Sequence, residues 1–224
     1  MTKTVYFDLF FTLIIPAYPK ENSEFDLLNL SAAEWEQYAE KDLLYRERAL
    51  GFVRSGMEIV DKITALMPFQ VSAGQKEKIL RAREERMKNA LQTVPEEIVD
   101  VLRKLKSMGI KLGLISNADC IDCKYWRKSA LYPYFDDAVF SCAVGLLKPD
   151  RQIYELAMRR LNAFPEQCLF VGDGCSNELC GAKAAGMKTV FSEVLERKSM
   201  EQRAEILKYA DRHIERIGEL LDCL

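Results

Sequence analysis

The sequence predicts an α/β protein with a doubly wound parallel sheet and an inserted all-helical cap domain. From residue 95 onward, helical and strand-like segments alternate with short connections, which is typical of a parallel sheet covered by helices. The block from about residue 17 to about residue 92 interrupts this alternation after a single strand, because it is charged and helical. We therefore expect residues 1–16 and 93–224 to form the core and residues 17–92 the cap, with linkers near Pro16 and Pro95.

The first expected strand is the apolar run "TVYFDLF", residues 4–10, which contains one charged residue, Asp8. An ionised carboxylate is costly to bury unless something pairs with it. Asp8 should therefore lie at the end of this strand, where it faces a ligand, a metal ion or a cation.

Three helices are expected in the inserted block. The stretch 31–52 has apolar residues at three- and four-residue spacing, with Ser31 as N-cap and Glu34 as its capping-box partner. Two further helices are expected over 55–67 and 72–92. The arginines of the first helix and its continuation (Arg46, Arg48 and Arg54) are expected on a solvated face, with contact to an acidic substrate as the alternative.

The remaining elements alternate. Pro95 and Gly109 bound a helix, since proline suits the first turn and glycine the position after the last one. Strands are expected over 110–117, 136–141, 167–174, 187–192 and 211–214, and helices over 120–132, 150–162, 177–186 and 215–224.

Composition excludes several function classes. The 224 residues are 49% hydrophobic and 29% charged, and the net charge of -2 offers no basic field for nucleic acid. The longest apolar run is far shorter than the roughly 20 residues that span a bilayer, and the N-terminus lacks a signal-peptide pattern, so we expect a cytoplasmic protein. His213 is the only histidine, and the seven scattered cysteines are expected to be reduced, so any metal ion should have oxygen ligands.

Polar residues end four of the expected strands or follow them. These residues are Asp8, the pair Ser116 and Asn117, Lys148 in the loop after the third strand, and Asp173. The carboxyl ends of parallel strands form one edge of the sheet, where ligands bind. Each residue alone has an ordinary explanation as a cap, a turn or a solvated side chain. Their joint occurrence predicts one site with a nucleophile, oxyanion donors, a cation and a metal ligand.

These segments resemble the four motifs of the haloacid dehalogenase superfamily of hydrolases, most of whose members are Mg²⁺-dependent phosphatases. The matching stretches, in order, are "DLFFT", "LISN", "GLLKPD" and "GDGCSNE", and "AKAAGM" is similar to the stretch that follows the fourth motif. The resemblance covers the whole core, implies a Rossmann-like fold, and places the helical block where the family carries a cap. It leaves the substrate open.

The resemblance implies a role for each matching residue. Asp8 would be the nucleophile that forms an aspartyl-phosphate, and Thr12 and Lys148 would be its catalytic partners. Ser116 and Asn117 would bind the phosphoryl group. Mg²⁺ would be held by Asp8, by the backbone carbonyl of Phe10, and by Asp173 and Glu178. Hard oxygen ligands suit this ion.

Phe10 departs from the family pattern. Phosphatases of the family usually carry a second aspartate there, which protonates the leaving group, and a glycine in place of Phe11. General acid–base catalysis typically contributes roughly 10²- to 10⁴-fold. We therefore expect a phosphatase that acts slowly on alkyl phosphates of small metabolites.

Three alternatives stay open. The family's 2-haloacid dehalogenases carry an aromatic residue at the position of Phe10 and use no metal, whereas the carboxylates Asp173 and Glu178 favour Mg²⁺. A carbon–phosphorus hydrolase would need a cap lysine that we cannot assign. The third alternative is a catalytically weak, regulatory phosphate-binding protein. We expect a small-molecule partner, no nucleic acid, no membrane, and a monomer or homodimer.

Overall fold

A six-stranded parallel sheet forms the centre of the protein. The computed structural model describes residues 2–40 and 42–224. The strands are β1 (Thr4–Phe7), β2 (Lys111–Ser116), β3 (Asp137–Phe140), β4 (Cys168–Gly172), β5 (Lys188–Ser192) and β6 (Arg212–Ile214). Their order is β3-β2-β1-β4-β5-β6, and every neighbouring pair is parallel. The doubly wound parallel sheet predicted from the sequence is thus confirmed.

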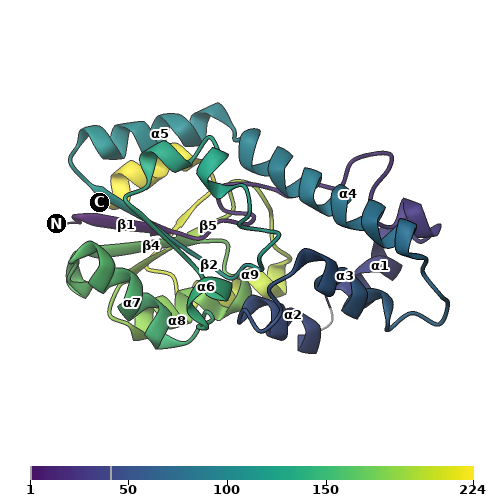
Figure 1. Ribbon diagram of the computed structural model, residues 1–224. Coiled ribbons are helices and arrows are strands. Elements are labelled where there is room, and N and C mark those ends of the chain that lie inside the picture. The colour runs from purple at the N-terminus through teal and green to yellow at the C-terminus, as the bar shows by residue number, and fades with distance from the viewer. Residues whose placement is uncertain (1, 41) are drawn as a thin grey trace.

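Helices cover both faces of this sheet. Helix α5 (Glu96–Ser107) and the 3₁₀ helix η6 (Ile217–Cys223) pack with Val5 and Phe7 of β1 on one face. Helices α7 (Arg151–Leu161) and α8 (Glu178–Ala184) pack with Tyr6 on the other. Figure 1 shows α5 on one side of the strands and α7 and α8 on the opposite side. Both faces are buried because successive residues of a strand point to opposite sides.

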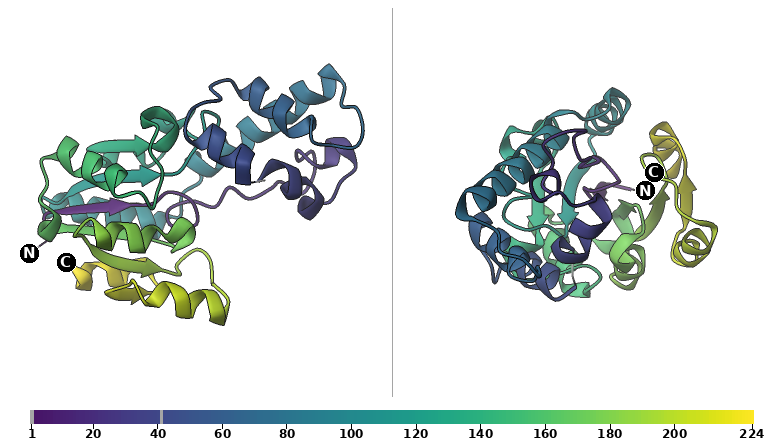
Figure 2. Two further views of the ribbon diagram at one scale, coloured as in Figure 1. Left: turned by 90° about the horizontal axis from the view of Figure 1, so that it is seen from below. Right: turned by 90° about the vertical axis from the view of Figure 1, so that its right-hand side faces the viewer.

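The segment between β1 and β2 is helical and has an apolar core of its own. It contains η1 (Asp26–Leu28), α1 (Ala32–Ala39), α2 (Asp42–Ala49), α3 (Gly56–Thr64) and α4 (Ala73–Gln92). Its buried cluster includes Trp35, Ile59, Ile63 and Ile79. Figures 1 and 2 show these helices gathered at one end of the molecule, whereas the two termini lie at the other.

Local signals account for several helix boundaries. Ser31 and Glu34 form the expected capping box at the start of α1, and Ser72 and Gln75 form another at the start of α4. Pro95 is the N-cap of α5, and Gly109 follows its end with φ +77°, a backbone conformation that glycine adopts easily. Within the described ranges, no helix combines the length and the apolarity needed to cross a membrane.

The remaining short elements include two helices that the sequence pattern did not predict. These are α6 (Ser141–Val144) and α9 (Met200–Leu207), and 3₁₀ helices lie at η2 (Trp126–Lys128), η3 (Tyr132–Tyr134), η4 (Pro165–Gln167) and η5 (Cys175–Asn177). Both missed helices are short, and α9 buries none of its side chains, so it lacks the apolar periodicity by which longer helices are recognised.

Three helix predictions were wrong in part. The expected helix 31–52 is divided into α1 and α2, and Lys41 between them lies outside the described residues. The expected helix 120–132 consists of turns, η2 and η3, because the Asp119 side chain accepts hydrogen bonds from the backbone N–H groups of Ile121 and Asp122. The closing helix is the 3₁₀ helix η6, in which Gly218 lowers the preference for an α-helix.

Candidate active site

Asp8 lies at the carboxyl edge of the sheet, directly after the central strand β1. Its backbone N–H donates to the carbonyl of Val171, so β1 and β4 stay paired up to this residue. The side chain is buried. β1 lies between β2 and β4, and Ser116 and Asp173 therefore come from the two strands beside it. The sequence order reverses at β1 and β4, which is the place where open α/β sheets bind ligands.

Lys148 is the cation that faces Asp8. Its Nζ forms an ion pair with the Asp8 carboxylate and lies 2.5 Å from Glu178 Oε2, and all three side chains are buried. Burial lowers the pKa of Lys148, but the Asp8 and Glu178 carboxylates outweigh this effect and raise the pKa above its ordinary value. Lys148 is therefore a permanent cation at neutral pH.

Three buried carboxylates meet at this point. One oxygen each of Asp8, Asp173 and Glu178 lie within 4.8 Å of one another. Burial raises the pKa of Asp8, an effect that Lys148 partly offsets, and burial followed by the Asp8 charge raises the pKa of Glu178 well above its usual range. Three close carboxylates repel one another, and oxygen donors with this spacing fit a hard divalent cation.

Two glycines shape the position of Glu178. A Cβ atom on Gly172 would lie 2.0 Å from Glu178 Oε1, so the Glu178 side chain would have to move. The N–H of Gly174 donates to the same oxygen at 3.1 Å, and Gly174 has φ +87°. Since both positions lie in "GDGCSNE", the glycines of this stretch make room for Glu178 and orient it.

The other predicted site residues surround Asp8 and Lys148. Thr12 Oγ1 donates to Asp8 Oδ2 at 3.2 Å. Asn117 fixes the backbone of Lys148, because its Oδ1 accepts from the Lys148 N–H at 2.8 Å and its Nδ2 donates to the Lys148 carbonyl at 3.1 Å. Ser116 Oγ is buried and has no hydrogen-bond partner within the described parts of the chain, so its hydroxyl group is available to a ligand.

Phe10 and Phe11 line the cavity of this site. Both are half-buried and line a cavity of about 330 Å³ whose wall also includes Asp8, Lys148 and Asp173. Phe11 has φ +58°, so it adopts the left-handed conformation for which glycine is usual. Phe11 therefore adopts the backbone conformation of the family's glycine in spite of its side chain.

Side chains of the helical segment also line the cavity. Arg48 of α2 and Arg83 of α4 line it, and both contact Asp119 in the loop after β2, with N–O distances of 3.0 and 2.9 Å. Arg83 also pairs with Asp122 at 3.3 Å. Arg48 is thus buried and paired, which corrects its expected place on a solvated face.

Sequence reasoning missed Lys198, whose Nζ lies 2.6 Å from Asp173 Oδ2. Burial lowers the pKa of Lys198, but the hydrogen bonds to Asp173 and Glu196 raise it overall. The residue follows the end of β5 at the same edge of the sheet, so reading the fifth strand to its end could have indicated it. Arg83 was missed as well, because nothing in a helix pattern shows that an arginine is buried.

A model of the family described as haloacid dehalogenase-like hydrolase matches residues 2–186. Among curated proteins, the glyceraldehyde 3-phosphate phosphatase of Methanopyrus kandleri is 33% identical over 129 residues, which are 56% of this chain and 54% of that protein. The ribulose-1,5-bisphosphate 5-phosphatase of Halopiger xanaduensis is 28% identical over 127 residues, 55% of this chain and 53% of that protein. The chain thus spans about half the length of these relatives.

Solved structures share the fold. An enzyme of this family from Bacteroides thetaiotaomicron, in complex with magnesium and inorganic phosphate, has a TM-score of 0.68 at 20% identity, over 90% of this chain and 98% of that one. The 2-haloacid dehalogenase from Pseudomonas syringae has a TM-score of 0.70 at 21% identity, over 99% of this chain and 97% of that one. At such identities the likeness concerns the fold alone.

Proposed function

The chain belongs to the haloacid dehalogenase-like hydrolase family, and on this basis we propose that it is an Mg²⁺-dependent phosphatase that acts on a small phosphorylated metabolite. The observation that carries the proposal is the buried cluster of Asp8, Asp173 and Glu178 around Lys148. A nucleophilic carboxylate, a fixed cation and two further carboxylates are the groups that phosphoryl transfer through an aspartyl-phosphate requires.

In the proposed reaction, an oxygen of Asp8 attacks phosphorus and the alcohol oxygen of the substrate leaves. Water then attacks the phosphorus of the aspartyl-phosphate, which breaks the bond to Asp8, releases inorganic phosphate and restores the carboxylate. Lys148 neutralises charge between Asp8 and the phosphoryl oxygens, and Asn117 holds Lys148 in place through its backbone. Thr12 orients Asp8, and the free hydroxyl group of Ser116 donates to a phosphoryl oxygen.

Asp8, Asp173, Glu178 and the backbone carbonyl of Phe10 would hold Mg²⁺. The donor set fits this ion, because the three side chains contribute oxygen atoms that already lie within 4.8 Å of one another. When bound, the ion reduces the repulsion between carboxylates and phosphate and stabilises charge on the phosphoryl oxygens.

We also propose that residues 17–92 form a cap over the core made of residues 1–16 and 93–224. The helical segment has its own apolar cluster, and side chains of both parts line the cavity above Asp8. The contacts of Arg83 and Arg48 with Asp119 join the two parts. Such a cap excludes water from the reacting phosphate.

A phosphorylated sugar or similar small molecule is the proposed substrate. The cavity of about 330 Å³ has room for a small ligand and not for a macromolecule. Relatives that are about 30% identical carry the names of phosphatases for glyceraldehyde 3-phosphate and ribulose-1,5-bisphosphate.

Phe10 favours a second candidate, a 2-haloacid dehalogenase-like hydrolase. Halide leaves without a proton, so this reaction needs no acid at position 10. The carboxylates Asp173 and Glu178 are harder to explain in this reaction, because it uses no metal ion. We therefore rank it second.

The two candidates are separated by a panel of alkyl, aryl and acyl phosphates and 2-haloacids, each assayed with Mg²⁺ and with a chelator. A phosphatase releases phosphate only with Mg²⁺, whereas a dehalogenase releases halide with or without it. Failure to release phosphate from any ester would reject the first candidate.

A further inference from the structure

A second lysine, Lys198, contacts the carboxylate cluster through Asp173. Its Nζ lies 2.6 Å from Asp173 Oδ2 and 3.5 Å from Cys175 Sγ, and it also pairs with Glu196. The side chains of Lys198 and Asp173 are 5% and 1% exposed. A buried ammonium group thus already occupies one oxygen of a carboxylate that we assign to the metal site.

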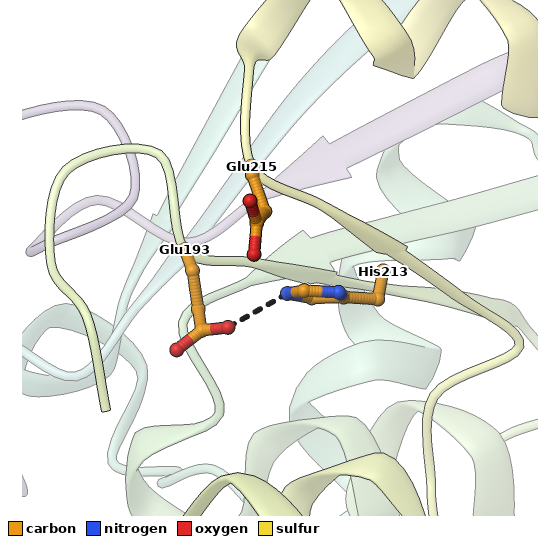
Figure 3. A group of neighbouring side chains, drawn as sticks. All are labelled: Glu193, His213 and Glu215. Atoms are coloured by element: carbon orange, nitrogen blue, oxygen red, sulfur yellow. Dashed lines mark hydrogen bonds and ion pairs between the residues drawn. The ribbon is translucent and has the colours of Figure 1, made fainter. Parts of the chain in front are cut away.

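The position of Lys198 is fixed by contacts of its backbone. Its N–H donates to Glu193 Oε1 at 2.9 Å, and Glu193 is buried just after the end of β5. The other oxygen of Glu193 lies 2.7 Å from His213 Nε2 and 3.2 Å from Arg203 Nε, and Figure 3 shows the bond between Glu193 and His213. Lys198 is therefore placed by a buried anchor, although its segment has no regular secondary structure.

The cluster of Glu193, His213 and Glu215, to which this anchor belongs, is not assigned as a metal site. Glu193, His213 and Glu215 offer ligand atoms within 4.8 Å of one another. Two guanidinium groups already neutralise these carboxylates, however, because Arg203 contacts both and Arg197 lies 2.6 Å from Glu215 Oε1. The cluster is better explained as the structure that holds the segment of Lys198.

The ammonium of Lys198 and a divalent cation on Asp173 would be close neighbours of like charge. A lysine side chain is charged at neutral pH, and repulsion between cations is strong where water is largely excluded. Asp173 Oδ1 already accepts from the N–H of Cys175 at 3.1 Å, and Oδ2 accepts from Lys198 Nζ at 2.6 Å, so a cation that binds Asp173 competes with the ammonium group for the charge of this carboxylate.

We propose that Lys198 competes with Mg²⁺ for the carboxylate of Asp173 and so lowers the affinity of the site for the ion. The inference rests on the proposed Mg²⁺ site. In this proposal the Lys198 ammonium group leaves Asp173 Oδ2 when the ion binds. The segment between β5 and α9, which carries Lys198, therefore shifts on metal binding.

Isothermal titration of the full chain with MgCl₂ tests the proposal. Lys198→Met removes the ammonium group, and Lys198→Gln replaces it with a neutral amide that can still donate to Asp173. Both variants should bind Mg²⁺ more tightly, on the order of tenfold, as is common for coupling between neighbouring sites. Lys198→Arg keeps the positive charge and should bind Mg²⁺ about as weakly as the wild type. Lys208→Met, which removes an exposed lysine paired with Glu205, is the matched control for net charge and should change nothing.

The outcomes distinguish this inference from the proposed function. A wild type that binds Mg²⁺, with equal or weaker binding in both neutral variants, overturns the competition and leaves the Mg²⁺ site standing. A wild type and variants that all fail to bind Mg²⁺ overturn both. A purely structural role of Lys198 cannot produce tighter binding, because a disordered site loses affinity.

Discussion

Replacing Phe10 by aspartate should restore a general acid to this site. Phe10 lines the cavity that also contains Asp8 and Lys148, so a carboxyl group at position 10 would face the bound substrate. The backbone needs no further change, because Phe11 already has φ +58°. The expected gain in kcat/KM for alkyl phosphates is at most roughly 10²- to 10⁴-fold, equivalent to about 3–5 kcal/mol of transition-state stabilisation.

The structure also bounds the loss of stability in this variant. Phe10 is half-buried and packs against the apolar clusters of both the sheet and the helical segment. Truncating a fully buried phenylalanine costs about 3–5 kcal/mol, so half of that, about 2 kcal/mol, is expected here. Most small domains tolerate a loss of this size, and thermal unfolding should confirm that the variant is folded before rates are compared.

The assay compares an alkyl phosphate with an aryl phosphate, both with saturating Mg²⁺. Phe10→Asp should accelerate the alkyl substrate selectively, since an aryl oxide leaves without a proton. Phe10→Asn is the matched control. Asparagine has nearly the shape of aspartate and the variant loses the same aromatic ring, but the amide cannot supply the proton. Equal gains in both variants, or rapid alkyl hydrolysis by the wild type, would refute the idea that Phe10 removes the acid.

Three other substitutions test the site. Asp8→Asn should abolish turnover and leave the fold intact, because it removes the charge of the proposed nucleophile and keeps the shape of the side chain; retained activity would exclude an aspartyl-phosphate. Gly172→Ala should displace Glu178, whose Oε1 would lie 2.0 Å from the new methyl group, and should weaken the rise in melting temperature caused by Mg²⁺; an unchanged rise would contradict Glu178 as a ligand. Burial, with the nearby Asp119 carboxylate, raises the pKa of Asp122 from 3.8 to about 6, so its contribution to stability is full below pH 3.8 and is lost as the pH rises through about 6. Relative to Asp122→Asn, the wild type should lose up to about 3 kcal/mol of unfolding free energy over this range in denaturant titrations, and parallel curves would disprove the shift.

The sequence by itself was enough for the fold class and for most elements. Alternation of strands and helices predicted the parallel sheet, and the capping box of Ser31 and Glu34 predicted the start of α1. These signals depend on contacts within one helical turn or on the two faces of one strand, so they can be read locally. The rule that ligands bind at the carboxyl edge also brought Asp8, Lys148 and Asp173 together correctly.

Only the tertiary structure showed which charges are paired. Lys198 lies 25 positions after Asp173 along the chain, and Arg83 reaches Asp119 from another part of the protein. Both contacts depend on the path of irregular segments and on how the helical segment sits above the sheet, and neither leaves a periodic pattern. Burial then decides their effect, because water screens a charge less in the protein interior than at the surface. The sequence could therefore indicate the groups of the site, whereas the electrostatic balance among them follows from the folded structure alone.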